Sequence, residues 1–189
     1  MPPRGSGSFV AAVDEIVVET ERLIVRKWRD SDAGEVAAIY AKPEVMQYIP
    51  RGVWSAEQTQ RIIARMRELD EEQGFGFYPI VLKSSGGIMG HCGLGYLEKS
   101  GEVEIAYVLD SPYWGQGYAS EAVNAVLGRA FSSTALTRIV AVAMPENTRS
   151  IAVMKRARMT ELGPAEHFGM TVMKYERRKA VAEAQRDTQ

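Results

Sequence analysis

The spacing of apolar residues along the chain predicts a first strand followed by two amphipathic helices. Apolar and polar residues alternate over 22–27, as they do in a half-buried strand. Capping residues at 30–31 precede a helical pattern that Pro43 ends, because proline lacks the amide that a helix interior needs. Residues 55–58 then have capping-box spacing, and apolar residues three or four apart predict a second helix that ends near Gly74.

Three strands are predicted in quick succession after these helices. They occupy 75–83, 88–97 and 102–109, and the turns 84–87 and 98–101 separate them. Short turns that contain Ser and Gly join neighbouring antiparallel strands in hairpins. The three strands are therefore expected to form an antiparallel meander.

The second half of the chain predicts a crossover between two parallel strands. A helical pattern at 119–131 follows the strand 102–109, and a strand, a helix and a last strand are predicted at 138–143, 147–156 and 168–175. Because strand–helix–strand crossovers are right-handed, the strands on either side of the first of these helices should be parallel. Ligands of such units bind at the carboxyl ends of the parallel strands. Together with the meander, this order predicts an α+β fold.

A glycine loop, Trp114-Gly115-Gln116-Gly117-Tyr118-Ala119, connects the strand 102–109 to the following helix. The first amides of a helix have no intrahelical acceptor, and the aligned peptide dipoles leave partial positive charge there. Gly117 would let the backbone approach an anion without a Cβ in between. The loop therefore predicts a pyrophosphate site. The alternative is that its glycines simply join a strand to a helix.

The length of 189 residues is sufficient for one hydrophobic core, and no internal repeat or linker divides the chain. We expect a flexible segment at 1–15, rich in Gly, Pro and Ser, a single domain at 16–176 and a charged tail at 177–189. A net charge of -1 gives the surface no general attraction to nucleic acid or to anionic membranes. The oligomeric state stays open between monomer and homodimer.

The single cysteine, Cys92, excludes an intrachain disulfide framework and is typical of a reducing cytoplasm. It lies in an apolar run, where a free cysteine packs as a small hydrophobe rather than acting as a nucleophile. The first residues lack a signal-peptide core, and no apolar run is long enough to span a bilayer. We therefore expect a cytoplasmic protein. No cluster of His, Cys, Asp and Glu has the spacing of metal ligands, so no metal is expected.

The order of the elements and several spaced motifs resemble the GCN5-related N-acetyltransferase (GNAT) superfamily, and most closely its ribosomal-protein-alanine (RimJ/RimL-like) branch. The resemblance extends over residues 20–175. Several motifs in the same order make it specific. The motifs are Thr20-Glu21-Arg22-Leu23, Pro43-Glu44-Val45-Met46-Gln47-Tyr48, Gly90-His91-Cys92-Gly93-Leu94, Glu104-Ile105-Ala106-Tyr107, Tyr113-Trp114-Gly115-Gln116-Gly117-Tyr118-Ala119-Ser120-Glu121-Ala122 and Pro145-Glu146-Asn147-Thr148-Arg149-Ser150.

The resemblance implies a mostly antiparallel sheet of six to seven strands, flanked by about four helices, whose parallel pair splays apart at the cofactor. It implies acetyl-CoA as the acetyl donor. Trp114 stands where the superfamily usually has Arg or Gln, which brings a side-chain contact into question but leaves the backbone contacts unaffected. The pantetheine arm would lie against the backbone of Tyr107, Val108 and Leu109. The pyrophosphate would bind at Gly115, Gln116, Gly117, Tyr118 and Ala119, with Ser120 in the first helical turn.

Three residues of the helix 147–156 are candidates for contact with the cofactor. Asn147 matches an asparagine that the family places near the pantetheine amides, and it is also a good helix N-cap. Ser150 matches a serine proposed to reprotonate the CoA thiolate, and a solvated hydroxyl is the alternative. Many relatives use a tyrosine acid at the position of Met154, so that acid is excluded here. Met154 is expected to contact the cofactor or to pack.

Two carboxylates compete for the role of general base, and each has the alternative of being an ordinary solvated glutamate. Glu166 matches a glutamate proposed as the base in the same branch. Glu104 lies in the pantetheine strand and would point into the acceptor cleft if Ile105 points into the core. His91 and His167 could move protons near neutral pH, but lone histidines more often form hydrogen bonds at a surface or a sheet edge.

The resemblance implies direct attack of a neutral primary amine on the thioester in a ternary complex. An α-amine with a pKa of about 8 is partly neutral at neutral pH, whereas a lysine amine with a pKa of about 10.4 is almost fully charged. A protein or peptide N-terminus is therefore the favoured acceptor. The alternatives are a small amine, such as an antibiotic or polyamine, and a module that binds acyl-CoA without turnover. Met46, Tyr48 and Trp54 are candidates for the acceptor site, with packing as the alternative.

Overall fold

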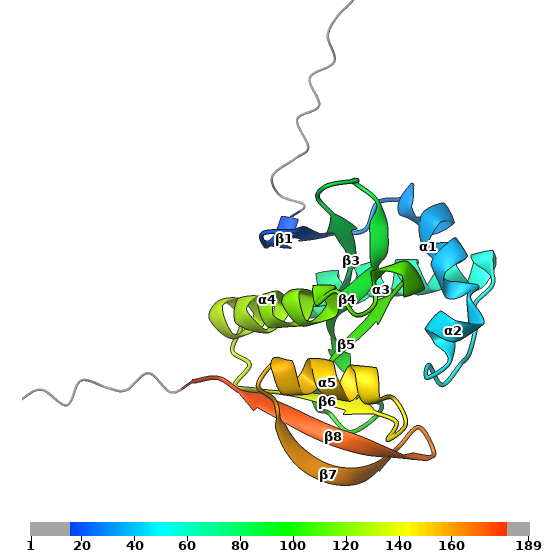
Figure 1. Cartoon of the computed structure of the whole chain (residues 1–189). Coiled ribbons are helices and arrows are strands. Elements are labelled where there is room, and N and C mark those ends of the chain that lie inside the picture. The colour runs from blue at the N-terminus through cyan, green and yellow to red at the C-terminus, as the bar shows by residue number, and fades with distance from the viewer. Residues whose placement is uncertain (1–15, 181–189) are drawn as a thin grey trace, which may run out of the picture.

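One eight-stranded sheet organises residues 16–180, the part of the chain that this computed structural model describes (Figure 1). The strands follow the order β1-β2-β3-β4-β5-β6-β8-β7 across the sheet. Neighbouring strands are antiparallel except for β5 and β6, which are parallel. The bounds are Ile16–Glu19 (β1), Leu23–Arg26 (β2), Phe77–Leu82 (β3), Ile88–Tyr96 (β4), Val103–Leu109 (β5), Arg138–Ala143 (β6), Thr160–His167 (β7) and Met170–Arg178 (β8).

Helices cover both faces of the sheet and divide the core in two. Buried residues of α4 and α5 pack on one face, and buried residues of α1, α2 and α3 pack on the other. Along β5, Val103 and Ile105 belong to the first core and Val108 to the second, because side chains alternate between the faces of a strand. The helices are α1 (Asp32–Tyr40), α2 (Pro43–Met46), α3 (Ala56–Gln73), α4 (Tyr118–Ser133) and α5 (Thr148–Arg156), with a 3-10 turn, η2, at Ser111–Tyr113.

The predicted α+β fold with a mostly antiparallel sheet is confirmed, but the sheet has more strands than the six or seven expected. The additional strands, β1 and β7, lie at the two edges of the sheet. β7 contains Gly163 and Pro164 and has no buried position. An edge strand tolerates proline because one of its sides has no partner strand. The predicted last strand, 168–175, corresponds to β8, and β7 lacks the apolar alternation that would have revealed it.

Capping residues set both ends of α3, and a proline begins α2. Ser55 and Gln58 form the predicted capping box at the start of α3, and Gly74 ends that helix in the left-handed conformation with a φ of 72°. Pro43 does more than follow α1, which already ends at Tyr40. It is the first residue of α2, where its missing amide would have no helical partner in any case. The structure therefore has one helix more than the four predicted, the one-turn helix α2.

The parallel strands separate shortly after they pair. β5 and β6 share a single register pair, Glu104 with Val140, whereas β4 pairs with β5 from Val103 to Leu109. Beyond Glu104 the two parallel strands diverge toward their carboxyl ends. The splayed pair that the resemblance implies is therefore present.

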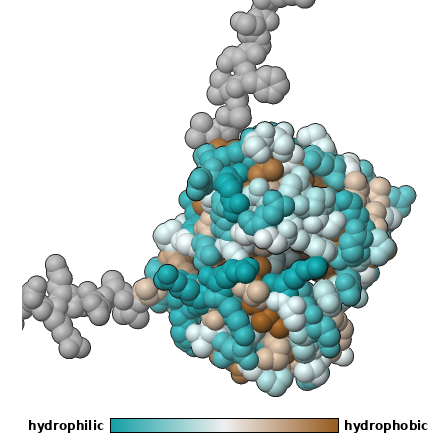
Figure 2. Space-filling view, viewed as in Figure 1, coloured by the Kyte–Doolittle hydropathy of each residue, from teal (hydrophilic) through white to brown (hydrophobic). Residues whose placement is uncertain are grey.

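The predicted domain boundaries fall only partly within the described residues. β8 extends to Arg178, so residues 177 and 178 of the predicted tail belong to the sheet. The predictions for 1–15 and 181–189 lie outside the described residues. No helix within 16–180 is long and apolar enough to cross a membrane. Figure 2 shows mainly hydrophilic residues on one face, with small and separate hydrophobic areas.

Candidate active site

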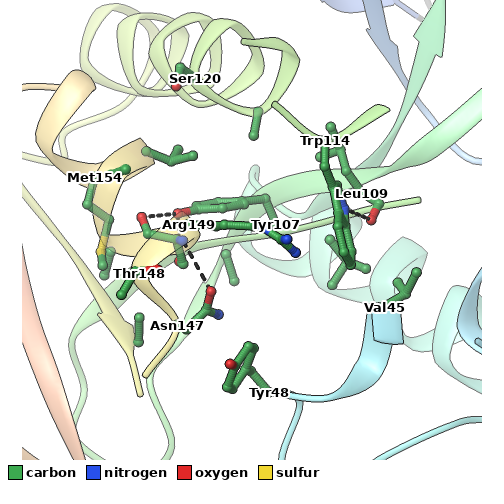
Figure 3. A pocket seen from close by; sticks show the side chains of 18 of the residues that line it. Val45, Tyr48, Tyr107, Leu109, Trp114, Ser120, Asn147, Thr148, Arg149 and Met154 are labelled. Carbon is green, nitrogen blue, oxygen red and sulfur yellow. Dashed lines mark hydrogen bonds between the residues drawn. The ribbon is translucent and has the colours of Figure 1, made fainter. Parts of the chain in front are cut away.

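A cavity of about 740 Å³ lies where β5 and β6 separate, bordered by the start of α4, by α5 and by α2 with the loop that follows it (Figure 3). Of the predicted cofactor-binding residues, only Gln116 is absent from its walls, because the side-chain amide of Gln116 turns back and donates to the carbonyl of Pro112 at 2.8 Å. The others line the cavity: Tyr107, Val108, Leu109, Trp114, Gly115, Gly117, Tyr118, Ala119, Ser120, Asn147, Ser150 and Met154.

The glycine loop presents the start of α4 to this cavity. Gly117 is the N-cap residue with a φ of 83°, a conformation that an L side chain rarely adopts. Glycine also supplies no side-chain acceptor, so no side chain of the described residues caps α4. The first amides of the helix therefore remain available to a ligand, and the helix dipole adds partial positive charge there.

A buried hydroxyl reinforces the case for an anion at the start of α4. The Oγ of Ser120 is buried, and it has no hydrogen-bond partner within residues 16–180. Buried hydroxyls normally have a partner, because an unpaired one costs about 1–3 kcal/mol. Ser120 lines the same cavity as the uncapped amides. A phosphate or pyrophosphate, which accepts hydrogen bonds only, therefore fits this chemistry.

Arg22, which precedes β2, supports the glycine loop from the side. Its guanidinium donates to the carbonyl of Gln116 at 3.1 Å and lies 4.2 Å from the ring centroid of Tyr118. The same guanidinium pairs with Glu121 at 2.6 Å, and the hydroxyl of Thr20 donates to the other carboxylate oxygen at 2.6 Å. These contacts explain why a Thr-x-Arg pattern near the N-terminus accompanies a glycine loop almost a hundred residues later.

Trp114 forms a hydrogen bond with one of the predicted pantetheine residues. Its indole N–H donates to the carbonyl of Leu109 at 2.7 Å and so holds the glycine loop against the end of β5. The Leu109 carbonyl therefore already has a partner. The other two predicted pantetheine residues, Tyr107 and Val108, form no backbone hydrogen bond with Trp114.

The start of α5 brings Asn147 and Ser150 to the opposite wall of the cavity. The Oδ1 of Asn147 accepts from the backbone amide of Ser150 at 3.2 Å, so its role as an N-cap is confirmed. Tyr107 reaches across from β5, and its hydroxyl oxygen lies 2.8 Å from Oγ and 3.0 Å from the carbonyl of Ser150 (Figure 3). Burial raises the pKa of the Tyr107 phenol, which therefore stays protonated.

The remaining apolar and aromatic candidates differ in whether they line the cavity. Met154 is fully buried in the core and also lines the cavity, so both of its predicted roles are structurally possible. Tyr48 lines the cavity on the α2 side, as expected of an acceptor-site residue. Met46 and Trp54 do not line it. Met46 is buried between the sheet and α1, and Trp54 stacks edge-on against Tyr40 with ring centroids 4.8 Å apart.

The two candidate bases, Glu166 and Glu104, differ in burial and in position. Glu166 is exposed in β7, where its carboxylate accepts from the hydroxyl of Thr171 at 2.7 Å, and it does not line the cavity. Glu104 is half-buried on β5, and Ile105 points into the core, which was the condition for Glu104 to face the other way. Glu104 does not line the cavity either, but it shares that face of β5 with Ala106, which does. Burial, with a smaller effect of the Glu98 charge, raises the pKa of Glu104 to about 7.

Neither histidine lines the cavity. His91 is buried and forms a hydrogen bond with the hydroxyl of Tyr40. Burial lowers its pKa to about 4, so His91 is neutral at neutral pH. His167 lies at the β7–β8 turn, with Nδ1 3.1 Å from the Glu98 carboxylate. Cys92 is fully buried and its pKa is raised by burial, which confirms the packing interpretation.

The side chains of the cavity that were not predicted as site residues include the phenol of Tyr107 and the guanidinium of Arg149. Both belong to motifs that resemble the family. Tyr107 ends the motif that begins at Glu104, and Arg149 lies between Asn147 and Ser150 in the motif that begins at Pro145. Their position in those motifs was the available signal. Which way each side chain points depends on the packing of β5 against α5, which local spacing does not determine.

Comparisons with known proteins agree with this geometry. The family model of the acetyltransferase (GNAT) domain matches residues 22–160. The uncharacterized N-acetyltransferase p20 of Bacillus licheniformis is 34% identical over 137 residues, which are 71% of this chain and 77% of that protein. A GNAT-family acetyltransferase from Bacillus anthracis superposes with a TM-score of 0.75 at 29% identity, covering 85% of this chain and 97% of the other.

A second solved structure has the same fold with a bound cofactor. RimL, a ribosomal L7/L12 α-N-protein acetyltransferase in complex with coenzyme A, superposes with a TM-score of 0.74 at 23% identity. The match covers 87% of this chain and 98% of RimL. Both the family match and the relatives favour an enzyme over a module that only binds acyl-CoA. The chain therefore belongs to the GNAT family of acetyltransferases, and it is an N-acetyltransferase.

Proposed function

We propose that this enzyme transfers the acetyl group of acetyl-CoA to the α-amine of a protein or peptide N-terminus. The observation that supports this most strongly is the cavity between the splayed strands, which contains an uncapped helix start and the unpartnered hydroxyl of Ser120. An anionic, elongated donor such as acetyl-CoA matches both features, because its pyrophosphate needs donors and its pantetheine arm needs an open strand.

Backbone groups would bind the donor. The amides of the glycine loop would hold the pyrophosphate, and the backbone of Tyr107 and Val108 would pair with the pantetheine arm. A backbone amide near Val108 would also stabilise the oxyanion that forms when the thioester carbonyl is attacked. The Leu109 carbonyl already accepts from Trp114, so one acceptor position is left there for the arm.

The reaction needs one base and one acid. The neutral amine attacks the thioester carbon, and the tetrahedral intermediate collapses to an amide and the CoA thiolate. Glu104 would take the proton that the amine loses, because a carboxylate with a pKa of about 7 is a base suited to neutral pH. Ser150 would donate a proton to the thiolate, and Tyr107 would hold the Ser150 hydroxyl in place. No covalent acyl-enzyme forms.

The choice of an N-terminal α-amine rests on its acidity and on one relative. An α-amine loses its proton more easily than a lysine side chain, by about two to three pKa units. RimL, which shares this fold, is described as an α-N-protein acetyltransferase. The rival acceptor is a small polycation, because Glu44 and Glu146 also line the cavity and would attract one.

A thiol-release assay distinguishes these acceptors. Purified protein is mixed with acetyl-CoA and with peptides that have free N-termini, with polyamines or with aminoglycosides. We expect thiol release with free N-termini and none with the same peptides blocked by acetylation. Release with polyamines or aminoglycosides alone would replace the acceptor assignment. Failure of the protein to bind acetyl-CoA in calorimetry would overturn the donor assignment as well.

A further inference from the structure

Arg149 extends across the mouth of the cavity from α5 to the glycine loop (Figure 3). Its Cζ atom lies 4.7 Å from the centroid of the Trp114 ring, within the range of a cation–π interaction. Arg149 is in the first turn of α5 and Trp114 is at the beginning of the glycine loop. The guanidinium is therefore held on the opposite side of the cavity from the α5 backbone, beside the predicted pyrophosphate site.

Arg149 differs from the other cation that lines the cavity, Arg156, in that it contacts the glycine loop. Among the described residues that line the cavity, the charged ones are Glu44, Glu146, Arg149 and Arg156. The glycine loop itself contains no cation, and Arg22 beside it is already paired with Glu121. Arg149 has no carboxylate partner within residues 16–180. It is thus an uncompensated positive charge next to uncapped helix amides.

We propose that Arg149 binds a phosphate group of the coenzyme A moiety, with Trp114 as the platform that positions its guanidinium. This inference rests on the proposed function and specifies how the donor is bound. The amides of the glycine loop and the guanidinium that lies on Trp114 would contact the phosphates together. The glycine loop has no cationic side chain of its own, and Arg149 brings a positive charge to it from α5.

The chemistry of arginine suits this position. A planar guanidinium can donate two parallel hydrogen bonds to a phosphate while its face stays on an indole ring. Lysine has the same charge but lacks the planar fork, so it would replace arginine only in part. Arg149 is exposed, and alanine is a good helix former, so its replacement should leave the fold intact.

Calorimetry with coenzyme A and with dephospho-coenzyme A tests this proposal. The variants are Arg149→Ala, Arg149→Lys and the control Arg61→Ala, which removes an exposed arginine of α3 that does not line the cavity. We expect Arg149→Ala to weaken coenzyme A binding about tenfold or more, because charge-assisted hydrogen bonds are lost. Arg149→Lys should recover part of this loss, and Arg61→Ala should bind like wild type.

The two ligands distinguish which phosphate is bound. An equal loss with both ligands would place Arg149 on the pyrophosphate, which both contain. A loss confined to coenzyme A would place it on the 3′-phosphate, which dephospho-coenzyme A lacks. Wild-type affinity of Arg149→Ala for both ligands would overturn this inference alone. Failure of the wild-type chain to bind either ligand would overturn the proposed function, and this inference with it.

Discussion

The hydroxyl oxygen of Tyr107 lies 2.8 Å from the Oγ of Ser150, so a strand side chain contacts the first turn of α5 across the cavity. Where many relatives have a tyrosine acid on α5, this chain has Met154, which is fully buried. A tyrosine hydroxyl is nevertheless present beside the serine, and it comes from β5. Because the Tyr107 phenol stays protonated, it can donate to Ser150 and leave the serine proton free for the departing thiolate.

Replacing Tyr107 by Phe should slow acetyl transfer about threefold to tenfold, because one hydrogen bond of about 1 kcal/mol is lost. The affinity for acetyl-CoA should stay near wild type, since the strand backbone is retained. Thiol-release rates and calorimetry measure the two quantities. Tyr96→Phe is a matched control, because its hydroxyl bonds only to the exposed side chain of Gln73. Unchanged turnover in Tyr107→Phe would show that this contact has no part in the reaction.

Replacing Ser150 by Ala should reduce turnover more than Tyr107→Phe does, with little change in cofactor affinity. The backbone amide of Ser150 would still donate to Asn147, so the cap of α5 is kept. If Tyr107 acts only through Ser150, the double variant should be no slower than Ser150→Ala alone. Additive losses in rate would instead indicate two independent roles and would contradict the positioning of Ser150 by Tyr107.

Gly117 should tolerate few replacements, because both its backbone conformation and the space next to its Cα favour glycine. Its φ of 83° strains an L side chain, and an added Cβ would lie 3.6 Å from Nη2 of Arg22, at the loop proposed to bind the anion. Gly117→Val is expected to abolish acetyl-CoA binding in calorimetry. Gly117→Asn separates the two demands, since Asn adopts the left-handed conformation more readily. Gly128→Ala, inside α4 with open space around it, is the control. Full affinity in Gly117→Val would remove the glycine loop from the binding site.

The elements around the proposed donor site could be predicted largely from sequence because local backbone geometry forms them. The glycine loop, the strand before it and the helix that Asn147 caps are each specified within a few residues. Positions that depend on distant packing were not predictable in the same way. Arg149 reaches Trp114 only because α5 packs beside α4. β7 has no apolar alternation, and it is ordered by pairing with β8.

The acid–base assignment shows the same limit of local information. Glu166 and Glu104 are both glutamates in strands; the resemblance indicated Glu166 and strand alternation indicated Glu104. Tertiary burial distinguishes them, since Glu104 is half-buried beside the cavity wall and Glu166 is exposed at the far edge of the sheet. Only the folded arrangement buries Glu104 and brings the charge of Glu98 near it, and burial more than this charge raises the pKa of Glu104.

The raised pKa of Glu104 should be visible in both activity and stability. Its carboxylate must be ionised to act as a base, so turnover is expected to rise with pH through about 7. Folding favours the protonated form, so Glu104 contributes stability that is complete below the unfolded pKa of about 4.5 and is lost as pH rises through about 7. Glu104→Gln should therefore lower turnover and flatten the pH dependence of the melting temperature over this range.

Two further variants test whether this pH dependence belongs to Glu104. Glu98→Gln removes a nearby negative charge and should move the rise in turnover to lower pH, while its side-chain oxygen can still accept from the amide of Phe168. Glu166→Gln is the comparison, and it should resemble wild type in both measurements. If Glu166→Gln rather than Glu104→Gln lost turnover, the base would be the exposed carboxylate of β7. A cavity rearranged by acceptor binding would then be required to bring that carboxylate to the amine.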